Sequence, residues 1–107
     1  MVTLRVRLLK GFLDKSIGLT RSAKAYPVYF TTRFGIHTLG MKFPIDVIVL
    51  NNNNQVMKTA ENLKPNRFFF WPPIYNRVVE LPSNTIKKLR VKKEDKIKLE
   101  ITKCFYT

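Results

Sequence analysis

The chain has 107 residues, 45% of them hydrophobic, which is enough for one compact domain spanning residues 1–107. The residue patterns described below predict that this domain is mainly β. Twenty Lys and Arg against seven acidic residues give a net charge of +13, which favours polyanionic partners such as RNA or DNA. No segment approaches the roughly 20 apolar residues of a membrane span, and Cys104 is the one cysteine, which excludes an internal disulfide. We therefore expect a cytoplasmic protein without a membrane partner.

The N-terminal part of the chain predicts strand, helical turn, loop and strand in that order. Apolar and polar residues alternate from Val2 to Leu8, which is typical of a half-buried strand. Apolar residues between Phe12 and Leu19 suggest a helical turn or two, and the polar stretch from Thr20 to Lys24 a loop. Aromatic and β-branched residues from Val28 to Phe34 predict a second strand.

A β-hairpin is the clearest local prediction. Ile45 to Leu50 is a short apolar run that reads as a buried strand. Asn51 to Asn54 follow, and asparagine tolerates the left-handed backbone that tight turns require. Gln55 to Ala60 is then the partner strand.

The C-terminal half adds further short elements. An extended segment from Arg67 to Trp71 is closed by Pro72 and Pro73, and a strand from Tyr75 to Leu81 follows. A helical turn capped by Ser83 then runs through Ile86 and Leu89. The last strand extends from Ile97 to Thr102. Several short strands joined by tight turns predict a small compact barrel-like sheet with one or two short helical turns.

Three stretches of the chain resemble a known family. They are residues 35–46, which contain the pattern His-x-x-x-Met-x-x-Pro-x-Asp, then Asn62 to Pro65, then Glu80 to Thr85 followed by Asp95. With Lys10 to Phe12 and Gly18-Leu19, their order and spacing resemble the small prokaryotic proteins of domain of unknown function 192. The resemblance covers nearly the whole chain and implies a small β-rich fold. Because no activity is assigned to the family, the resemblance implies no particular reaction, substrate or cofactor.

The chain departs from the family pattern at two turns. Asn84 and Glu94 stand where the family usually has glycine. Asn84 adopts positive φ at modest cost, so we expect that turn to persist. At Glu94 we expect a different or slightly strained turn.

His37, Met41 and Asp46 form the candidate binding cleft. In one interpretation His37 is a ligand or a proton carrier oriented by Asp46, at one end of the barrel. In the other, Asp46 accepts backbone hydrogen bonds and His37 packs beside Met41, both in structural roles. Acidic, serine and glycine residues show no catalytic or phosphate-binding spacing, so we assign no catalytic residue, metal site or cofactor.

Two further surfaces are candidates for interaction. In the run Arg67 to Trp71, alternate side chains face opposite sides of a strand, so either Phe69 and Trp71 or Phe68 and Phe70 are outside. We take Phe69 and Trp71 as the candidate partner surface, suited to a ligand or to a second copy of the chain. Basic residues are concentrated late in the chain, at Lys87, Lys88, Arg90, Lys92, Lys93, Lys96, Lys98 and Lys103, and Arg5 and Arg7 join them if the first and last strands are neighbours. The first five of these late residues, Lys87, Lys88, Arg90, Lys92 and Lys93, are the candidate nucleic-acid face.

The sequence thus favours a binding module over an enzyme. The first hypothesis is that its basic residues hold RNA or DNA phosphates. The alternative is a small-ligand site, or an unassigned enzymatic activity, at the cleft around His37, Met41 and Asp46.

Overall fold

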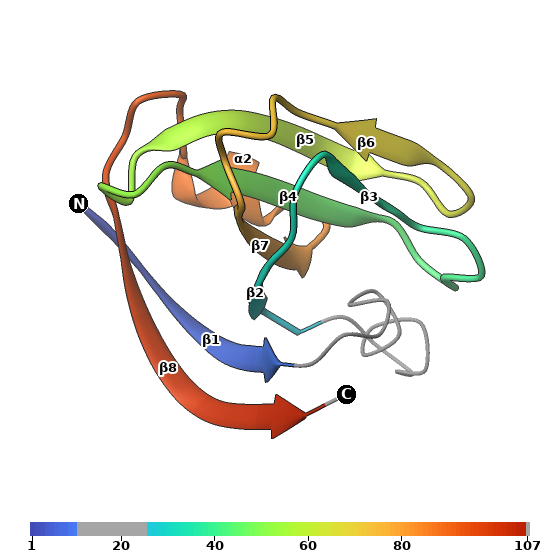
Figure 1. The fold of residues 1–107 in the computed structure, drawn as a ribbon, viewed down its shortest axis with the longest axis horizontal. Helices are drawn as coiled ribbons and strands as arrows, with labels where there is room; N and C mark the ends of the chain where they lie inside the picture. The colour runs from blue at the N-terminus through green and yellow to red at the C-terminus, as the bar shows by residue number, and fades with distance from the viewer. Residues whose placement is uncertain (11–25, 107) are drawn as a thin grey trace.

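The computed structural model describes residues 1–10 and 26–106 of the chain (Figure 1). The helical turn and loop predicted between Phe12 and Lys24 lie outside these residues. The elements, in chain order, are β1 (Val2–Lys10), β2 (Val28–Thr31), β3 (Gly35–His37), β4 (Ile45–Leu50), β5 (Val56–Leu63), β6 (Phe68–Phe70), β7 (Arg77–Pro82), α2 (Thr85–Leu89) and β8 (Ile97–Tyr106). No helix among the described residues is long and apolar enough to cross a membrane.

The main sheet has six strands in the order β5-β4-β7-β2-β1-β8, and β3 and β6 form a separate two-stranded ribbon. Strand β1 runs parallel to β2 and β8, and the other pairs are antiparallel. The sheet curls strongly (Figure 1), and Gln55 and Lys96, the residues just before its edge strands β5 and β8, form an isolated bridge. The predicted mainly β, barrel-like sheet is confirmed, although the sheet does not close into a full barrel.

Strand β4 is buried along its whole length, so both faces of the sheet must be covered. Because side chains alternate between faces, Ile45, Val47 and Val49 join one apolar cluster and Ile48 and Leu50 join another. We call the first the ribbon-side cluster, because it contains Ile36 of β3 together with Val28, Phe30, Met41, Trp71 and Val78. The second is the helix-side cluster, which contains Ile86 of α2 together with Leu4, Val6, Val56, Val79, Leu81, Val91 and Ile97.

The predicted hairpin is confirmed, and the strand predicted over Val28–Phe34 is only partly so. The asparagine turn joins β4 to β5, and Asn51 holds it with its Oδ1, which accepts the N–H of Asn53 at 2.8 Å. Strand β2 ends at Thr31, because Phe34 takes a left-handed φ of 73° that breaks extended structure. The chain then re-enters strand conformation at Gly35.

The short helix forms where predicted but starts differently. Asn84 precedes α2 at φ 73°, which confirms the expected positive φ. The predicted cap at Ser83 is wrong, because its hydroxyl donates to Oδ1 of Asn62 at 2.6 Å instead. A carboxylate from β4 takes the capping role, as described below.

The turn before Asp95 is strained, as expected from the sequence. Glu94 has φ 78°, a left-handed conformation, and its N–H donates to the carbonyl oxygen of Val56 at 2.6 Å. Oδ2 of Asp95 accepts the N–H of Lys92 at 2.8 Å. These bonds hold a residue with a Cβ in a backbone conformation that suits glycine.

Replacing Glu94 with glycine is expected to stabilise the protein. The left-handed conformation costs roughly 1–2 kcal/mol for a residue with a Cβ, and the larger entropy of unfolded glycine offsets roughly 0.5–1 kcal/mol of the relief. Urea unfolding should therefore give a free energy of unfolding about 0.5–1 kcal/mol higher for Glu94→Gly. The control Glu94→Ala removes the same charge but keeps a Cβ. An equal gain in that variant would mean that charge, not backbone conformation, is responsible.

Candidate functional site

Asp46 is fully buried and serves as a hydrogen-bond acceptor for two separate segments. Its Oδ1 accepts the N–H of Asn62 at 2.8 Å, and its Oδ2 accepts the N–H of Ile86 at 2.8 Å. The pairing of β4 with β5 shifts between Ile45 and Val47, and Asn62 has a left-handed φ of 55° at this bulge. The carboxylate thus satisfies a bulge amide and caps α2 from a distant strand, which agrees with the structural interpretation of Asp46.

His37 and Met41 are not brought together with Asp46. Met41 is 5% exposed and belongs to the ribbon-side cluster, whereas Asp46 points to the opposite face of β4, toward α2. His37 is half-buried on β3, where its Nδ1 accepts the N–H of Leu39 at 3.3 Å. Its ring lies edge-on to that of Phe68, with centroids 6.2 Å apart. The predicted cleft is therefore not present as one site.

A hollow of about 480 Å³ lies elsewhere on the surface. It is lined by Arg33, Asn52, Pro73, Ile74 and Asn76, so none of the three predicted cleft residues contributes to it. No three His, Cys, Asp or Glu side chains are grouped to hold a metal ion in residues 1–10 and 26–106.

Thr38 is an organising residue that the sequence analysis missed. It is fully buried, its hydroxyl donates to the carbonyl oxygen of Lys64 at 2.7 Å, and the same oxygen accepts the N–H of Arg67 at 2.9 Å. Its carbonyl oxygen accepts the N–H groups of Met41 and Asn66. These bonds fix the end of the ribbon. No local pattern reveals them, because the partners Lys64 and Arg67 lie 26 and 29 residues away.

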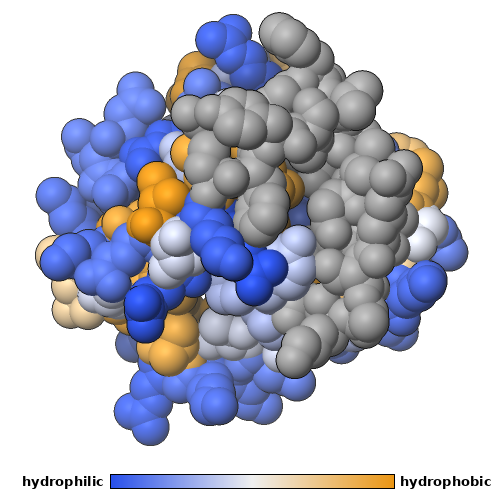
Figure 2. Space-filling model, turned by 90° about the horizontal axis from the view of Figure 1, so that it is seen from below, coloured by the Kyte–Doolittle hydropathy of each residue, from blue (hydrophilic) through white to orange (hydrophobic). Residues whose placement is uncertain are grey.

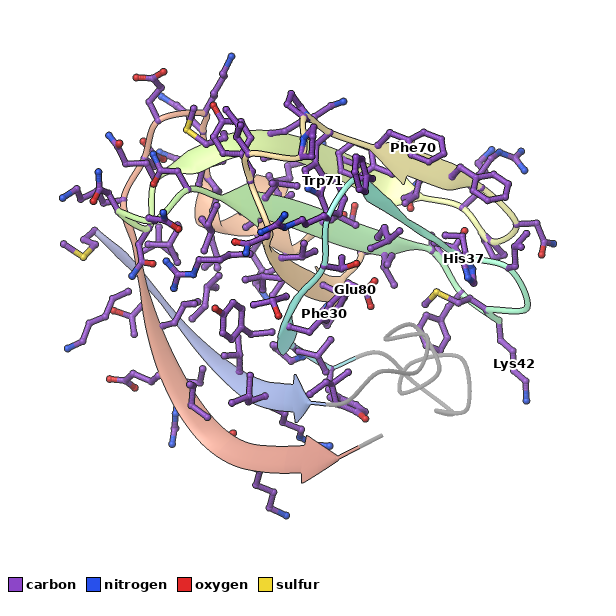
Figure 3. The ribbon with its side chains drawn as sticks, in the orientation of Figure 1. Phe30, His37, Lys42, Phe70, Trp71 and Glu80 are labelled. Atoms are coloured by element: carbon purple, nitrogen blue, oxygen red, sulfur yellow. The ribbon has the colours of Figure 1, made fainter. Side chains whose placement is uncertain are left out.

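In the aromatic run, the side chains expected to face outward, Phe69 and Trp71, face inward. Trp71 is only 4% exposed, and its indole N–H donates to the carbonyl oxygen of Tyr75 at 2.7 Å. Phe69 is half-buried against Trp71, with ring centroids 5.7 Å apart. The exposed side chains are Phe68 and Phe70, and Figure 3 shows Phe70 on the outside of the ribbon. The exposure expected for Trp71 is therefore wrong.

The physical reason is the register of the ribbon. Ile36 pairs with Phe69, and both side chains pack against the ribbon-side cluster. His37 and Phe68 form the next pair and face the other way. The pairing joins segments about thirty residues apart, so the sequence of the run alone leaves both alternations open.

The Lys/Arg face (Lys87, Lys88, Arg90, Lys92 and Lys93) is exposed throughout. Its first two members lie in the last turn of α2, and Arg90 ends the helix with φ 57°. None of these side chains forms an ion pair with a carboxylate in the described part of the chain. Glu94, the exposed acid that follows them, is engaged through its backbone.

The first and last strands are neighbours, as the extension of the basic face to Arg5 and Arg7 requires. Strands β1 and β8 pair in parallel over the full length of β1. Arg5 lies 3.9 Å from Glu100 across this pair, between two well-exposed side chains, so the contact is weak.

The fold defines a small mainly β protein whose curled mixed sheet is covered by a short helix on one face and a two-stranded ribbon on the other. A family model described as "Uncharacterized ACR", DUF192, matches residues 3–99. A UPF0127 protein of Pyrococcus furiosus is 31% identical over 102 residues, covering 90% of this chain and 87% of that protein. The chain belongs to the DUF192 family.

Two solved structures share the fold. One is a protein of unknown function from Novosphingobium aromaticivorans, with a TM-score of 0.70, 17% identity, and coverage of 82% of this chain and 70% of the other. The second, from Sinorhizobium meliloti, is described as a "putative transcription regulator" and has a TM-score of 0.67 at 19% identity. The matched region covers 82% of this chain and 78% of the Sinorhizobium meliloti chain. At these identities the likeness concerns the fold alone.

Replacing Asp46 with asparagine is expected to destabilise the protein without changing side-chain size. The amide offers one acceptor oxygen for two N–H donors, and its NH₂ group then faces the second donor. We expect the free energy of unfolding to fall by about 2–3 kcal/mol, because a buried donor is left unsatisfied. Urea unfolding measures this, with the exposed Glu61→Gln as the control for loss of a carboxylate. An Asp46→Asn variant as stable as the control would show that the two hydrogen bonds contribute little.

Proposed function

We propose that this protein is a binding module that holds the phosphates of RNA or DNA through the Lys/Arg face. The observation that carries the proposal is the exposure of Lys87, Lys88, Arg90, Lys92 and Lys93 within one short helix and the turn after it, without carboxylate partners in the described chain. Cations that pair with phosphates release condensed counterions, which is the main source of sequence-independent affinity for nucleic acid.

The charge of the whole chain supports the same conclusion. A net charge of +13 on 107 residues attracts polyanions from any direction. On the face seen in Figure 2, most of the coloured side chains are hydrophilic, with hydrophobic side chains among them. Such a surface suits a solvated, charge-led contact better than a large apolar interface.

Enzymatic activity is the weaker proposal because the buried acid and the histidine have separate surroundings. Asp46 is engaged by two backbone amides, and His37 lies on the other side of the sheet beside Phe68. A His37 proton carrier oriented by Asp46 requires the two side chains to be in contact. A binding role uses the exposed cations directly.

A salt titration tests the proposal. Binding to a fluorescent mixed-sequence single-stranded RNA, measured by anisotropy from low ionic strength upward, is expected to weaken linearly on a log–log plot. Replacing Lys88 and Lys92 together with glutamine should lower the slope by about 0.7 for each phosphate that the protein no longer neutralises, and weaken binding at every sequence tested.

The matched control is Lys98→Gln with Lys103→Gln, which removes the same charge from exposed positions of β8. It should reduce the affinity less and keep more of the slope. Absence of RNA binding by the wild-type chain at the lowest salt would contradict the proposal. Equal reductions in both double variants would show that net charge acts without a defined face.

A further inference from the structure

The outward side of the β3–β6 ribbon displays two phenylalanines where a water-facing strand normally carries polar residues. Phe68 and Phe70 are 59% and 60% exposed. The inward side is filled by Ile36 and Phe69, which pack on the ribbon-side cluster. The ribbon therefore has an apolar core side and a separate aromatic outer side.

The exposed rings lie nearly parallel to each other. The planes of Phe68 and Phe70 differ by 6°, with centroids 5.9 Å apart, and the edge of the His37 ring packs against Phe68. Rings spaced this way are within the range of favourable aromatic pairs. The two rings stack on each other, so the face that each can offer to a ligand is the one turned away from its neighbour.

Gly35 makes this arrangement possible. It pairs with Phe70 across the ribbon, and a Cβ added there would lie 2.6 Å from Cδ1 of Phe70 and 2.5 Å from the carbonyl oxygen of Phe69. Any larger residue would displace the Phe70 ring. The absence of a side chain on β3 thus allows the ring on β6 to lie across it.

Basic residues lie on the segments that build and adjoin the ribbon. Nζ of Lys58 donates to the carbonyl oxygen of Phe70 at 2.6 Å and lies 4.9 Å from the centroid of Phe69, which ties β5 to the ribbon. Figure 3 shows His37 and Lys42 at the same end of the molecule. The exposed basic residues on β5 and on the segments around the ribbon are Arg33, Lys42, Lys58, Lys64 and Arg67. Residues 33–44 and 64–79, which include the two ribbon strands, contain no Asp or Glu.

We propose that the outer side of the ribbon is a stacking platform for the bases of a single-stranded nucleic acid, with Phe68 and Phe70 as its stacking residues. The inference rests on the proposed function, since the same ligand class is involved. Aromatic faces flanked by cations match an unpaired strand, whose bases expose their π-faces and whose phosphates carry the complementary charge. A duplex conceals its base faces, and a second copy of the chain would bring like charges together.

The test compares variants that keep or remove the rings. The double variant Phe68→Leu with Phe70→Leu preserves apolar character but removes both aromatic faces. Affinity for a short fluorescent mixed-sequence single-stranded RNA should fall at least tenfold, since each base stacked on an aromatic ring contributes a factor of about 5 to 150 and two rings are removed. The salt slope should stay unchanged, because no cation is removed. The exposed Ile101→Ala on β8 is the distant control and should bind like the wild type.

An abasic single strand of equal length separates stacking from charge. The wild-type chain should bind it more weakly than the RNA, and the leucine variant should bind it as the wild type does. Trp71 fluorescence checks that the ribbon remains folded, because this side chain packs against Phe69 beneath the platform.

Several results would overturn the inference. If the wild type binds the abasic strand as tightly as the RNA and the leucine variant binds RNA like the wild type, the platform fails while the proposed phosphate binding stands. If no strand binds at low salt, both fail. If sedimentation shows a dimer that the leucine variant dissociates, the ribbon is a contact between copies and the inference is wrong.

Discussion

Asp46 lies in β4, a strand buried along its whole length, and its two carboxylate oxygens each accept a backbone N–H from a different part of the chain. One bond holds the bulge at Asn62, after which the chain leaves β5 and turns into the ribbon. The other holds the first turn of α2 at Ile86, from which the Lys/Arg face extends. One buried side chain therefore positions the segments that lead into both candidate interaction surfaces.

Burial of β4 on both faces explains why the two surfaces exist at all. An apolar strand of this kind must be covered on both sides, and α2 and the ribbon supply the covers. Each cover turns its apolar side inward, through Ile86 and through Ile36 with Phe69. The opposite sides face water, and there the chain places lysines and arginines on one cover and aromatic rings on the other. Both are features that nucleic-acid ligands use.

Local patterns in the sequence were sufficient for much of the fold. The hairpin from Ile45 to Ala60 was predictable because a run that is apolar except for Asp46 meets four turn-forming asparagines. The strands at the two ends of the chain were predictable from the alternation of apolar and polar residues. The positive φ of Asn84 was predictable because this residue stands where the family usually has glycine. The split of the strand after Thr31 was not predictable, since β3 is three residues long and depends on a distant partner.

The candidate site was harder to predict, for the same reason. The residues His37, Met41 and Asp46 are close in sequence, yet β4 separates Met41 from Asp46 because its two faces serve different clusters. The sense of alternation in the aromatic run is set by the pairing of Ile36 with Phe69, a contact that no local pattern encodes. By contrast, exposure of the Lys/Arg face followed directly from charge, because unpaired lysines are almost never fully buried.

The most direct measurement is an NMR titration of the ¹⁵N-labelled chain with a short mixed-sequence single-stranded RNA at low salt. The account predicts that amide shifts concentrate in residues 87–93 and in the ribbon strands, residues 35–37 and 68–70. Shifts spread evenly over the surface, or confined to β1 and β8, would contradict the claim that these two covers of the sheet form the nucleic-acid contact.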